Sequence, residues 1–248
     1  MKIVTWNVNG IRARETQVRD LLLAERPDVA CLQEIKASPE QVPSLLAAPS
    51  DYWAYWHGAG PYSGVALLLR RDLAPDRPAF RHPALDRECR IVCADVGGTT
   101  VASVYVPNGG KDFAAKMRFL DDLLSWVGEL HASGGGLVLC GDLNVTRTDA
   151  DVHPKERKAG AIGQRPEERD LLARILTAGL VDVTRTLHPD DQELFTWWAP
   201  WRNLRQRNIG WRIDYVLVTE ALAGRVRACD VRREIGTSDH APVIAVLE

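Results

Sequence analysis

Short apolar runs rich in valine, isoleucine and leucine recur from one end of the chain to the other, each bounded by glycine, proline, asparagine or aspartate. Runs of this length, set between turn residues, are typical of buried β-strands. Because so many such runs must pair with one another, they constrain the fold more than any other feature. The predicted strands are Lys2–Trp6, Val29–Gln33, Gly64–Arg70, Arg90–Val96, Thr100–Tyr105, Leu137–Cys140, Arg212–Val218 and Pro242–Leu247.

Three segments between these runs have the pattern of helices, namely Glu15–Glu25, Asp112–His131 and Pro166–Thr177. Proline at the first position and acidic residues in the first turn favour a helix start at Pro166. In the second segment, apolar residues at helical spacing predict a packing face made of Phe113, Met117, Leu120, Leu124 and Val127. Many strands with only a few helices indicate an α/β fold in which sheets carry helices on their outer faces.

The chain has 248 residues, 46% of them hydrophobic and 26% charged, and no linker, repeat or low-complexity segment divides it. This predicts one globular domain over residues 1–248. The five cysteines form no CxxC pair and lie mostly in apolar runs, so we expect reduced thiols in an intracellular, cytoplasmic protein. No apolar stretch suits a signal peptide or a membrane span. The net charge of −2 neither supports nor excludes a nucleic-acid partner.

Oxygen-bearing side chains stand where the predicted strands begin or end. In chain order they are Asn7, Asn9, Glu34, Tyr105, Asn108, Asp142, Asn144, Asp214, Asp239 and His240. Side chains converge at strand ends, and carboxylate and amide oxygens are the ligands that Mg²⁺ prefers beside phosphate oxygens. A divalent cation stabilises the transition state of phosphoryl chemistry, and a histidine paired with a carboxylate can move protons near neutral pH. The set therefore predicts phosphodiester hydrolysis with Mg²⁺, or with Mn²⁺ in its place.

Each of these residues has a simpler interpretation when taken alone. Asn7 is a common turn residue, residues 141–144 could form a plain turn, and His240 could pack or cap in the core. The prediction therefore rests on the ensemble. No HxH, HExxH or paired-cysteine pattern predicts zinc, and no nucleotide-binding loop or GxSxG motif is present. The remaining histidines lack such neighbours and are predicted to be structural: His57, His82, His131, His153 and His188.

The opening segment, residues 1–13, resembles that of the exonuclease III family of abasic-site endonucleases. Further matching blocks follow in order along the whole chain: Leu32–Lys36, Tyr62–Ala66, Tyr105–Gly109, Gly141–Val145, Phe195–Trp198, Asn208–Tyr215 and Ser238–Pro242. The blocks around Glu34, Asp142 and His240 are shared by the wider endonuclease/exonuclease/phosphatase superfamily, whereas the Thr-Trp-Trp and Gly-Trp-Arg-Ile-Asp-Tyr blocks point to its DNA-repair branch. The resemblance implies a four-layered α/β sandwich of two packed mixed β-sheets flanked by helices.

The resemblance also implies a magnesium-dependent DNA repair nuclease that hydrolyses the phosphodiester 5′ to an abasic site and leaves a 3′-hydroxyl. Further implied activities are 3′→5′ exonuclease and 3′-phosphatase, on double-stranded DNA with abasic or damaged 3′ ends. We expect a monomer that needs no membrane. The implied metal residues are Glu34, Asn7 and Asp239, and the implied catalytic residues are Tyr105, Asp142, Asn144, Asp214 and His240. Which of Asp142 and His240 is the general base stays open.

A baseless sugar swings out of a duplex at low cost, because less stacking and no pairing must be broken. An apolar pocket can then accept this sugar and exclude one that carries a base. Trp197, Trp211 and Ile213 match the family's pocket positions, and Asn108 would line the cleft. Arg212 is expected to contact the substrate. Basic residues cluster in the sequence at Arg202, Arg205, Arg207 and Arg212, and a second group contains Lys155, Arg157 and Lys158.

The chain departs from the family pattern at Gly236-Thr237, where Lys-Pro is usual, and at Ala199-Pro200-Trp201. These departures leave the balance of endonuclease, exonuclease and phosphatase activities open. One alternative is a phosphodiesterase or phosphatase that acts on a lipid or inositol phosphate. Another is a non-catalytic DNA- or protein-binding module. The tryptophans and the basic cluster count against the first, and the complete polar set counts against the second.

Overall fold

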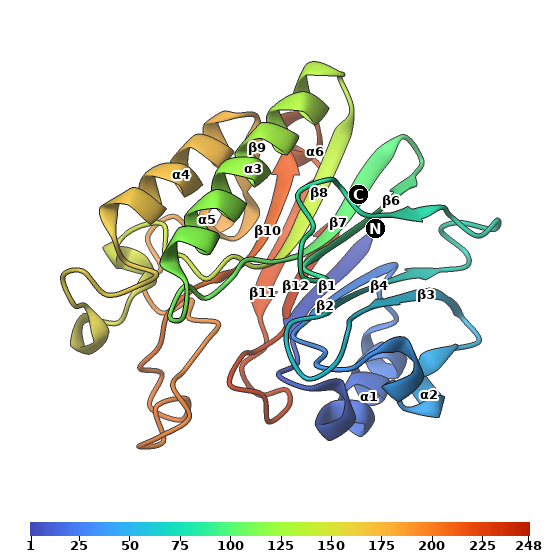
Figure 1. Ribbon diagram of the computed structural model, residues 1–248, viewed down its shortest axis with the longest axis horizontal. Helices are drawn as coiled ribbons and strands as arrows, with labels where there is room; N and C mark the ends of the chain where they lie inside the picture. Colours follow the sequence, from blue (N-terminus) through green and yellow to red (C-terminus); the bar gives the residue numbers. More distant parts are fainter.

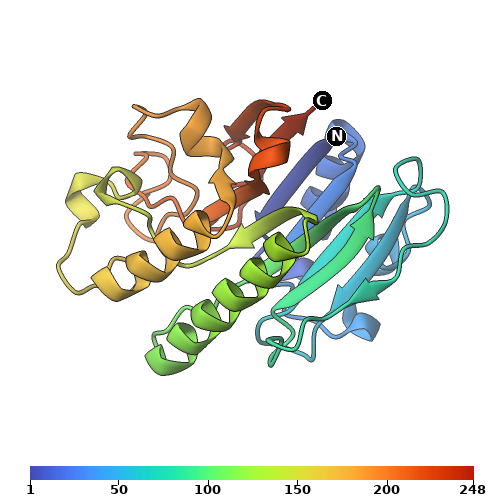
Figure 2. The same ribbon diagram turned by 90° about the horizontal axis from the view of Figure 1, so that it is seen from above.

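Two six-stranded mixed β-sheets pack face to face in the computed structural model, which describes residues 1–248 (Figures 1 and 2). In order across the first sheet, the strands are β11 (Val226–Val231), β12 (Val243–Leu247), β1 (Lys2–Asn7), β2 (Val29–Gln33), β4 (Val65–Arg70) and β3 (Tyr52–His57). In the second they are β5 (Phe80–Arg81), β6 (Ile91–Val96), β7 (Thr99–Tyr105), β8 (Gly136–Asp142), β10 (Asp214–Thr219) and β9 (Leu180–Asp182). Only β1 with β2 and β7 with β8 pair in parallel.

Helices cover the outer faces of both sheets, which confirms the predicted sandwich of two mixed sheets flanked by helices (Figure 2). On the first sheet lie α1 (Glu15–Glu25) and α2 (Ser44–Ala47), and on the second lie α3 (Phe113–Ala132) and α4 (Pro166–Thr177). Two shorter helices, α5 (Val183–Leu187) and α6 (Glu220–Ala223), border β9 and β10. Valine-rich faces of the two sheets form the central core between them. No helix has the length and apolarity that crossing a bilayer requires.

All the predicted strands form, with shifts of one or two residues at their ends. The strands that were not predicted are β3, β5, β9 and β11. β3 and β5 form one edge of the sandwich, and β9 and β11 are the other edge strands. Edge strands lack the continuous apolar run of a buried strand, because part of each is exposed to solvent. β5 and β9 are also too short, at two and three residues, to produce a periodic signal.

The buried face of α3 differs from the predicted one. Leu120 and Val127 are buried as expected, but the face also contains Phe119, Leu123 and the side chain of Lys116. Phe113, Met117 and Leu124 are only half-buried. The helix is therefore rotated from the predicted packing face, because an internal ion pair draws the lysine toward the core, as described below.

The two parallel strand pairs end at the same edge of the sandwich, and this positions the site. β1 and β2 end at Asn7 and Gln33, and β7 and β8 end at Tyr105 and Asp142. The antiparallel strand β10 begins at that edge with Asp214, which is the register partner of Asp142. Side chains from both sheets therefore converge there.

Candidate active site

A cavity of about 300 Å³ opens at this edge. Its wall contains all but two of the predicted site residues. The lining residues are Asn7, Glu34, Tyr105, Asn108, Asp142, Asn144, Ile162, Trp197, Trp211, Ile213, Asp239 and His240. Of the two others, Asp214 lies directly behind His240, and Arg212 lies outside the cavity wall.

The carboxylate of Asp142 is held by a buried network of amide hydrogen bonds. Asn7 Nδ2 donates to Asp142 Oδ2 at 2.9 Å, and Asn144 Nδ2 donates to the same oxygen at 3.2 Å. The backbone N–H of Asn144 donates to Oδ1 at 2.9 Å. Asn108 Nδ2 in turn donates to Asn144 Oδ1 at 3.2 Å. Because each amide is itself oriented, the carboxylate has a fixed position in the cavity wall.

His240 lies between two carboxylates. Its Nδ1 is 2.9 Å from Asp214 Oδ2, and its Nε2 is 3.9 Å from Asp142 Oδ2. The backbone of the loop that carries His240 is held by Trp6, whose Nε1 donates to the His240 carbonyl at 3.1 Å. Thr196 Oγ1 accepts the backbone N–H of Asp214 at 3.1 Å and holds that strand end in place. The imidazole therefore presents Nε2 to the cavity.

Burial and charge act in opposite directions on these groups. Burial raises the pKa of Asp142 to about 7, despite the opposing effect of the His240 imidazolium. Burial alone would lower the pKa of His240, but the carboxylates of Asp214 and Asp142 outweigh it and raise that pKa to about 10. At neutral pH the arrangement therefore holds an imidazolium beside a carboxyl group that is close to its own midpoint.

A second carboxylate, that of Glu34, lines the same cavity. The Tyr105 hydroxyl donates to Glu34 Oε1 at 2.7 Å, and Lys36 Nζ is 3.6 Å from Glu34 Oε2. Burial and the neighbouring carboxylates of Glu34 and Asp142 raise the pKa of Tyr105, so its hydroxyl stays protonated. Glu34 thus keeps lone pairs free on both oxygens for a cation.

Asp239 completes the acidic wall next to the indoles. Its Oδ1 accepts from Asn9 Nδ2 at 2.8 Å, and its Oδ2 accepts from Trp197 Nε1 at 3.1 Å. Burial would raise the pKa of Asp239, but the His240 imidazolium and these two hydrogen bonds outweigh it and lower the pKa. Asp239 is therefore ionised and adds negative charge to the cavity.

Several residues of the site have left-handed backbone conformations, which residues other than glycine rarely adopt. They are Asn9 (φ 45°), Glu34 (φ 51°), Lys36 (φ 51°) and Asn144 (φ 54°). Such conformations cost free energy and persist where surrounding contacts enforce them. Gly141, directly before Asp142, admits no side chain, since a Cβ there would lie 1.8 Å from the Val104 carbonyl oxygen. The local backbone is thus adapted to aim these side chains.

One part of the cavity wall, next to Asp239, is apolar. The rings of Trp197 and Trp211 meet edge to face, with centroids 5.3 Å apart at 75°, and Ile213 lies beside them. Ile162, which was not predicted, also lines this wall. Gly163 follows it with φ +88°, and a Cβ there would come within 3.0 Å of the Trp211 ring. The only sequence signal for Ile162 was an apolar residue within a long polar loop.

The sequence profile of the Endonuclease/Exonuclease/phosphatase family matches residues 4–240. The chain belongs to this family. An exodeoxyribonuclease of Bacillus subtilis (strain 168) is 34% identical over 255 residues, which cover 100% of this chain and 99% of the relative. A 3′ phosphatase from Neisseria, solved with a product DNA hairpin, superposes with a TM-score of 0.91 at 34% identity over 100% of this chain and 99% of that one. An AP endonuclease from Archaeoglobus fulgidus gives 0.87 at 30% identity, with coverage of 100% and 99%.

These similarities confirm the resemblance to the exonuclease III family that the sequence blocks carry. The family member described here is a hydrolase of the exodeoxyribonuclease III and AP endonuclease type. The relatives differ in their named activities, so the similarity alone does not select one of them.

Behind the site of this family member lies a buried ion pair that sequence reasoning missed. Lys116 of α3 and Glu168 of α4 pair with no exposure of either side chain. Lys116 Nζ also donates to the carbonyl oxygens of Asn144 at 2.7 Å and Asn108 at 3.3 Å. Glu168 accepts the backbone N–H of Gly163 at 2.7 Å. The pair therefore ties two helices to three segments of the cavity wall.

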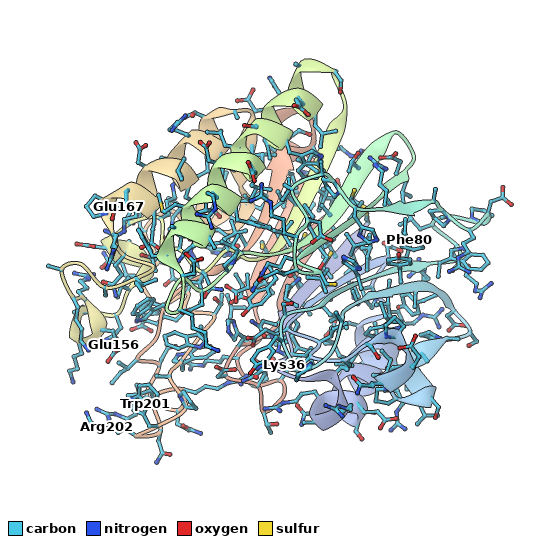
Figure 3. The ribbon with its side chains drawn as sticks, in the orientation of Figure 1. Lys36, Phe80, Glu156, Glu167, Trp201 and Arg202 are labelled. Carbon is cyan, nitrogen blue, oxygen red and sulfur yellow. The ribbon has the colours of Figure 1, made fainter.

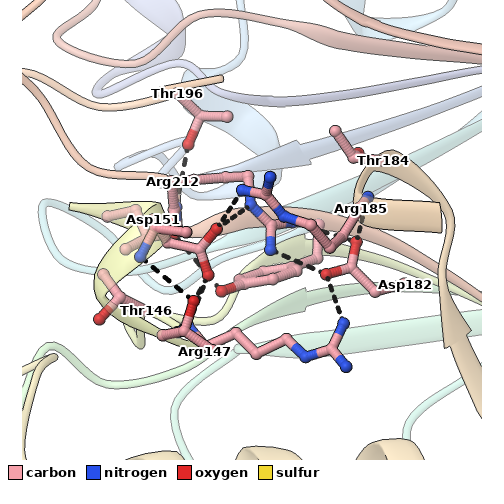
Figure 4. Close-up of polar contacts among 12 residues, drawn as sticks. Thr146, Arg147, Asp151, Asp182, Thr184, Arg185, Thr196 and Arg212 are labelled. Carbon is pink, nitrogen blue, oxygen red and sulfur yellow. Dashed lines mark hydrogen bonds and ion pairs between the residues drawn. The ribbon is translucent and has the colours of Figure 1, made fainter. Parts of the chain in front are cut away.

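The prediction that Arg212 contacts substrate is wrong in this structure. Its side chain has no exposure, its Nε donates to Asp151 at 2.7 Å, and its terminal nitrogens donate to Asp182 at 3.0 and 2.8 Å (Figure 4). Arg185 pairs with the same Asp151 at 2.7 Å. Neighbouring side chains in an extended segment point in opposite directions, so the two cavity residues that flank Arg212 leave it facing the core. Arg212 is a structural cation that holds this segment in place.

The predicted basic cluster is divided in the same way. The guanidinium of Arg205 is occupied by backbone hydrogen bonds, since it donates to the carbonyls of Arg233, Ile235 and Ser238 in the loop before the last strand. Arg202 and Arg207 remain exposed. Figure 3 shows Arg202 and the exposed Trp201 at the tip of a loop, on the same edge of the molecule as Lys36. Only part of the cluster is therefore available to a ligand.

Proposed function

We propose that this chain is a magnesium-dependent nuclease that hydrolyses the phosphodiester 5′ to an abasic site in double-stranded DNA and leaves a 3′-hydroxyl. The observation that carries the proposal is a single cavity in which a carboxylate–imidazole pair and a second carboxylate face a wall of two indoles. The same cavity would act on damaged 3′ ends as a 3′-phosphatase or 3′→5′ exonuclease, because those reactions also break a phosphorus–oxygen bond. The 3′ phosphatase with its DNA hairpin and the AP endonuclease among the similar structures support a DNA substrate.

Asp142 suits the role of general base for the attacking water. Its pKa of about 7 is matched to proton transfer near neutral pH, and Asn7 and Asn144 orient its carboxylate. His240 has a pKa raised to about 10, so it is already protonated and cannot accept the proton of water. It would instead donate from Nε2 to a phosphate oxygen, with Asp214 holding its orientation. In this proposal Tyr105 is a further donor to the phosphate.

Glu34 and Asn7 would hold the magnesium ion, with Asp239 beside them. Carboxylate and amide oxygens fit a hard cation, and manganese accepts the same donors. When bound, the ion would neutralise charge that develops on the phosphate. Asp142, Asp214 and His240 also lie within 4.8 Å of one another. We assign that trio to proton transfer, because Asp214 is already bonded to the imidazole and a protonated ring has no lone pair for a metal.

The indole wall supplies the selection for an abasic sugar. Trp197, Trp211, Ile213 and Ile162 enclose one side of the cavity, where they would contact a baseless sugar and obstruct a sugar that carries a base. Arg202, which is exposed, and Lys36, which is half-buried on the same edge, would contact DNA phosphates. Trp201 is 60% exposed and has an aromatic face available for stacking on bases.

Cleavage of a duplex oligonucleotide with one tetrahydrofuran abasic analogue tests the proposal. We expect incision 5′ to the analogue with Mg²⁺, incision with Mn²⁺, and none after addition of EDTA. The same duplex without the lesion controls for general nuclease activity. No metal-dependent incision by the parent protein would refute the endonuclease proposal. A nicked duplex that carries a 3′-phosphate, and an inositol phosphate, separate the other activities: phosphate release from the inositol compound alone would favour a non-DNA phosphatase.

A further inference from the structure

A second cluster of metal-binding side chains lies outside the active-site cavity, at the edge where β3 and β5 meet. His57 ends β3, His82 directly follows β5, and Asp86 lies in the loop that leads to β6. β3 and β5 are edge strands of different sheets. One ligand atom from each of the three residues lies within 4.8 Å of the others. Phe80 of β5, labelled in Figure 3, marks this edge and stacks on Tyr55 of β3 at 5.1 Å.

The three side chains bring two imidazole rings and one carboxylate, the donor types of a transition-metal site, into one cluster. His57 Nε2 is 2.5 Å from Asp86 Oδ2, and the two imidazole rings stack with centroids 3.8 Å apart at 22°. A divalent cation would bind both rings in their neutral form together with the carboxylate once the rings turn out of this stack, because the lone pairs of stacked rings do not meet at one point.

Backbone groups already hold one polar atom of Asp86 and one of His82, as the outer shell of a metal site requires. Asp86 Oδ1 accepts the backbone N–H of Arg90 at 2.7 Å and of Ile91 at 3.3 Å, so Oδ2 is left to face His57. His82 Nδ1 lies 3.2 Å from the Ile91 carbonyl oxygen. A proton on Nδ1 satisfies that carbonyl and leaves the Nε2 lone pair of His82 facing the Tyr55 hydroxyl at 3.0 Å, a hydrogen bond that a bound metal ion would replace.

We propose that His57, His82 and Asp86 form a binding site for a divalent transition-metal ion of the zinc class, which joins the edges of the two sheets. Two imidazoles and one carboxylate suit zinc, whereas magnesium avoids nitrogen donors. Ligand atoms on one tetrahedral zinc lie ~3.3 Å apart, so the 2.5 Å contact opens by under an ångström. His82 is exposed, which leaves the fourth position to water. The spacing of 25 and 4 residues between the ligands matches no zinc motif, so the sequence alone predicts no such site.

Titration of the full chain with Zn²⁺ at saturating Mg²⁺ tests this assignment. Isothermal calorimetry should show one zinc equivalent that magnesium does not displace, and a hundredfold excess of zinc over its Kd should raise Tm by roughly 5 °C. Substitution with Co²⁺ should give the visible spectrum of a tetrahedral or five-coordinate nitrogen–oxygen site. His82→Ala and Asp86→Asn should abolish this equivalent and the Tm shift. His131→Gln, which replaces an exposed histidine on α3, is the matched control and should retain both.

An unchanged zinc equivalent in His82→Ala would overturn the proposal, and so would the absence of any magnesium-resistant zinc in the parent protein. Either result would make His57 and Asp86 a simple ion pair between the two sheets. The variants lie outside the active-site cavity, so incision of the abasic duplex by each of them verifies that it is folded. The zinc test and the incision test therefore fail independently.

Discussion

Asp142, the last residue of β8, is the register partner of Asp214, the first residue of β10. Neighbouring antiparallel strands thus place two carboxyl groups on either side of one imidazole, at 2.9 Å from Nδ1 and 3.9 Å from Nε2 of His240. The pairing separates their roles, since Asp214 is bonded to the ring while Asp142 faces the cavity.

Asp214→Asn should lower kcat on order of 10³-fold while the fold stays intact, because the amide no longer stabilises the imidazolium or fixes its orientation. Single-turnover incision of the abasic duplex measures the rate, and far-UV circular dichroism checks the fold. Asp230→Asn, at an exposed position of β11, is the matched control and should leave kcat unchanged. A wild-type rate in Asp214→Asn would remove the pair from the mechanism.

The rate should depend on pH through Asp142 and His240. As the base, Asp142 must be ionised, so kcat/KM should rise about tenfold per pH unit below its pKa of about 7. It should fall again near pH 10, where His240 loses its proton. Higher magnesium should move the acidic limb to lower pH, because a nearby cation favours the carboxylate. The acidic limb of the profile can be tested with a slow Asp142→Glu variant. If the limb keeps its pH midpoint in that variant and does not respond to magnesium, it belongs to another group.

Lys116→Met should destabilise the protein by about 3–5 kcal/mol, because it leaves the Glu168 carboxylate buried and unpaired. The double variant with Glu168→Gln should recover much of this loss in urea unfolding. Its kcat should nevertheless stay below that of the parent, since the carbonyls of Asn108 and Asn144 have lost their donor. Full activity in a stable double variant would limit the pair to a packing role.

Arg212→Met should also destabilise the fold by about 3–5 kcal/mol, since Asp151 and Asp182 would lose their buried partner. The exposed Arg202→Met should change stability by less than about 0.5 kcal/mol but reduce the salt dependence of DNA binding. Urea unfolding and binding isotherms at several salt concentrations distinguish the two arginines. If Arg212→Met changed only the salt slope, the buried assignment would be wrong.

Trp211→Ala should reduce the preference for abasic over intact duplex by at least about tenfold, because the cavity wall recedes and admits a larger group. The ratio of kcat/KM values on the two duplexes measures this preference. Trp126→Ala, on a helix away from the cavity, is the control. Equal losses on both duplexes would mean that Trp211 acts on general binding and not on lesion selection.

The sequence predicted the strands that are buried on both faces, because a continuous apolar run can be identified from the sequence of that strand alone. It also predicted most of the cavity, since polar residues at the ends of such strands are unusual and matched family blocks. Edge strands such as β3 and β11 escaped because solvent exposure dilutes their pattern. Arg212 was assigned a wrong role and the burial of Lys116 was missed, both for the same reason. A buried arginine or lysine cannot be told from an exposed one in the sequence when its carboxylate partner is far away along the chain. Only the fold brings the two residues together.

The cavity draws its groups from both halves of the sandwich. Asn7, Glu34 and His240 come with the first sheet, and Tyr105, Asp142 and Asp214 come with the second. Neither sheet alone contains the complete set of active-site residues, even when it is fully folded. During refolding, catalytic competence should therefore arise only when the halves dock, and the enzyme's own turnover would report the final assembly step.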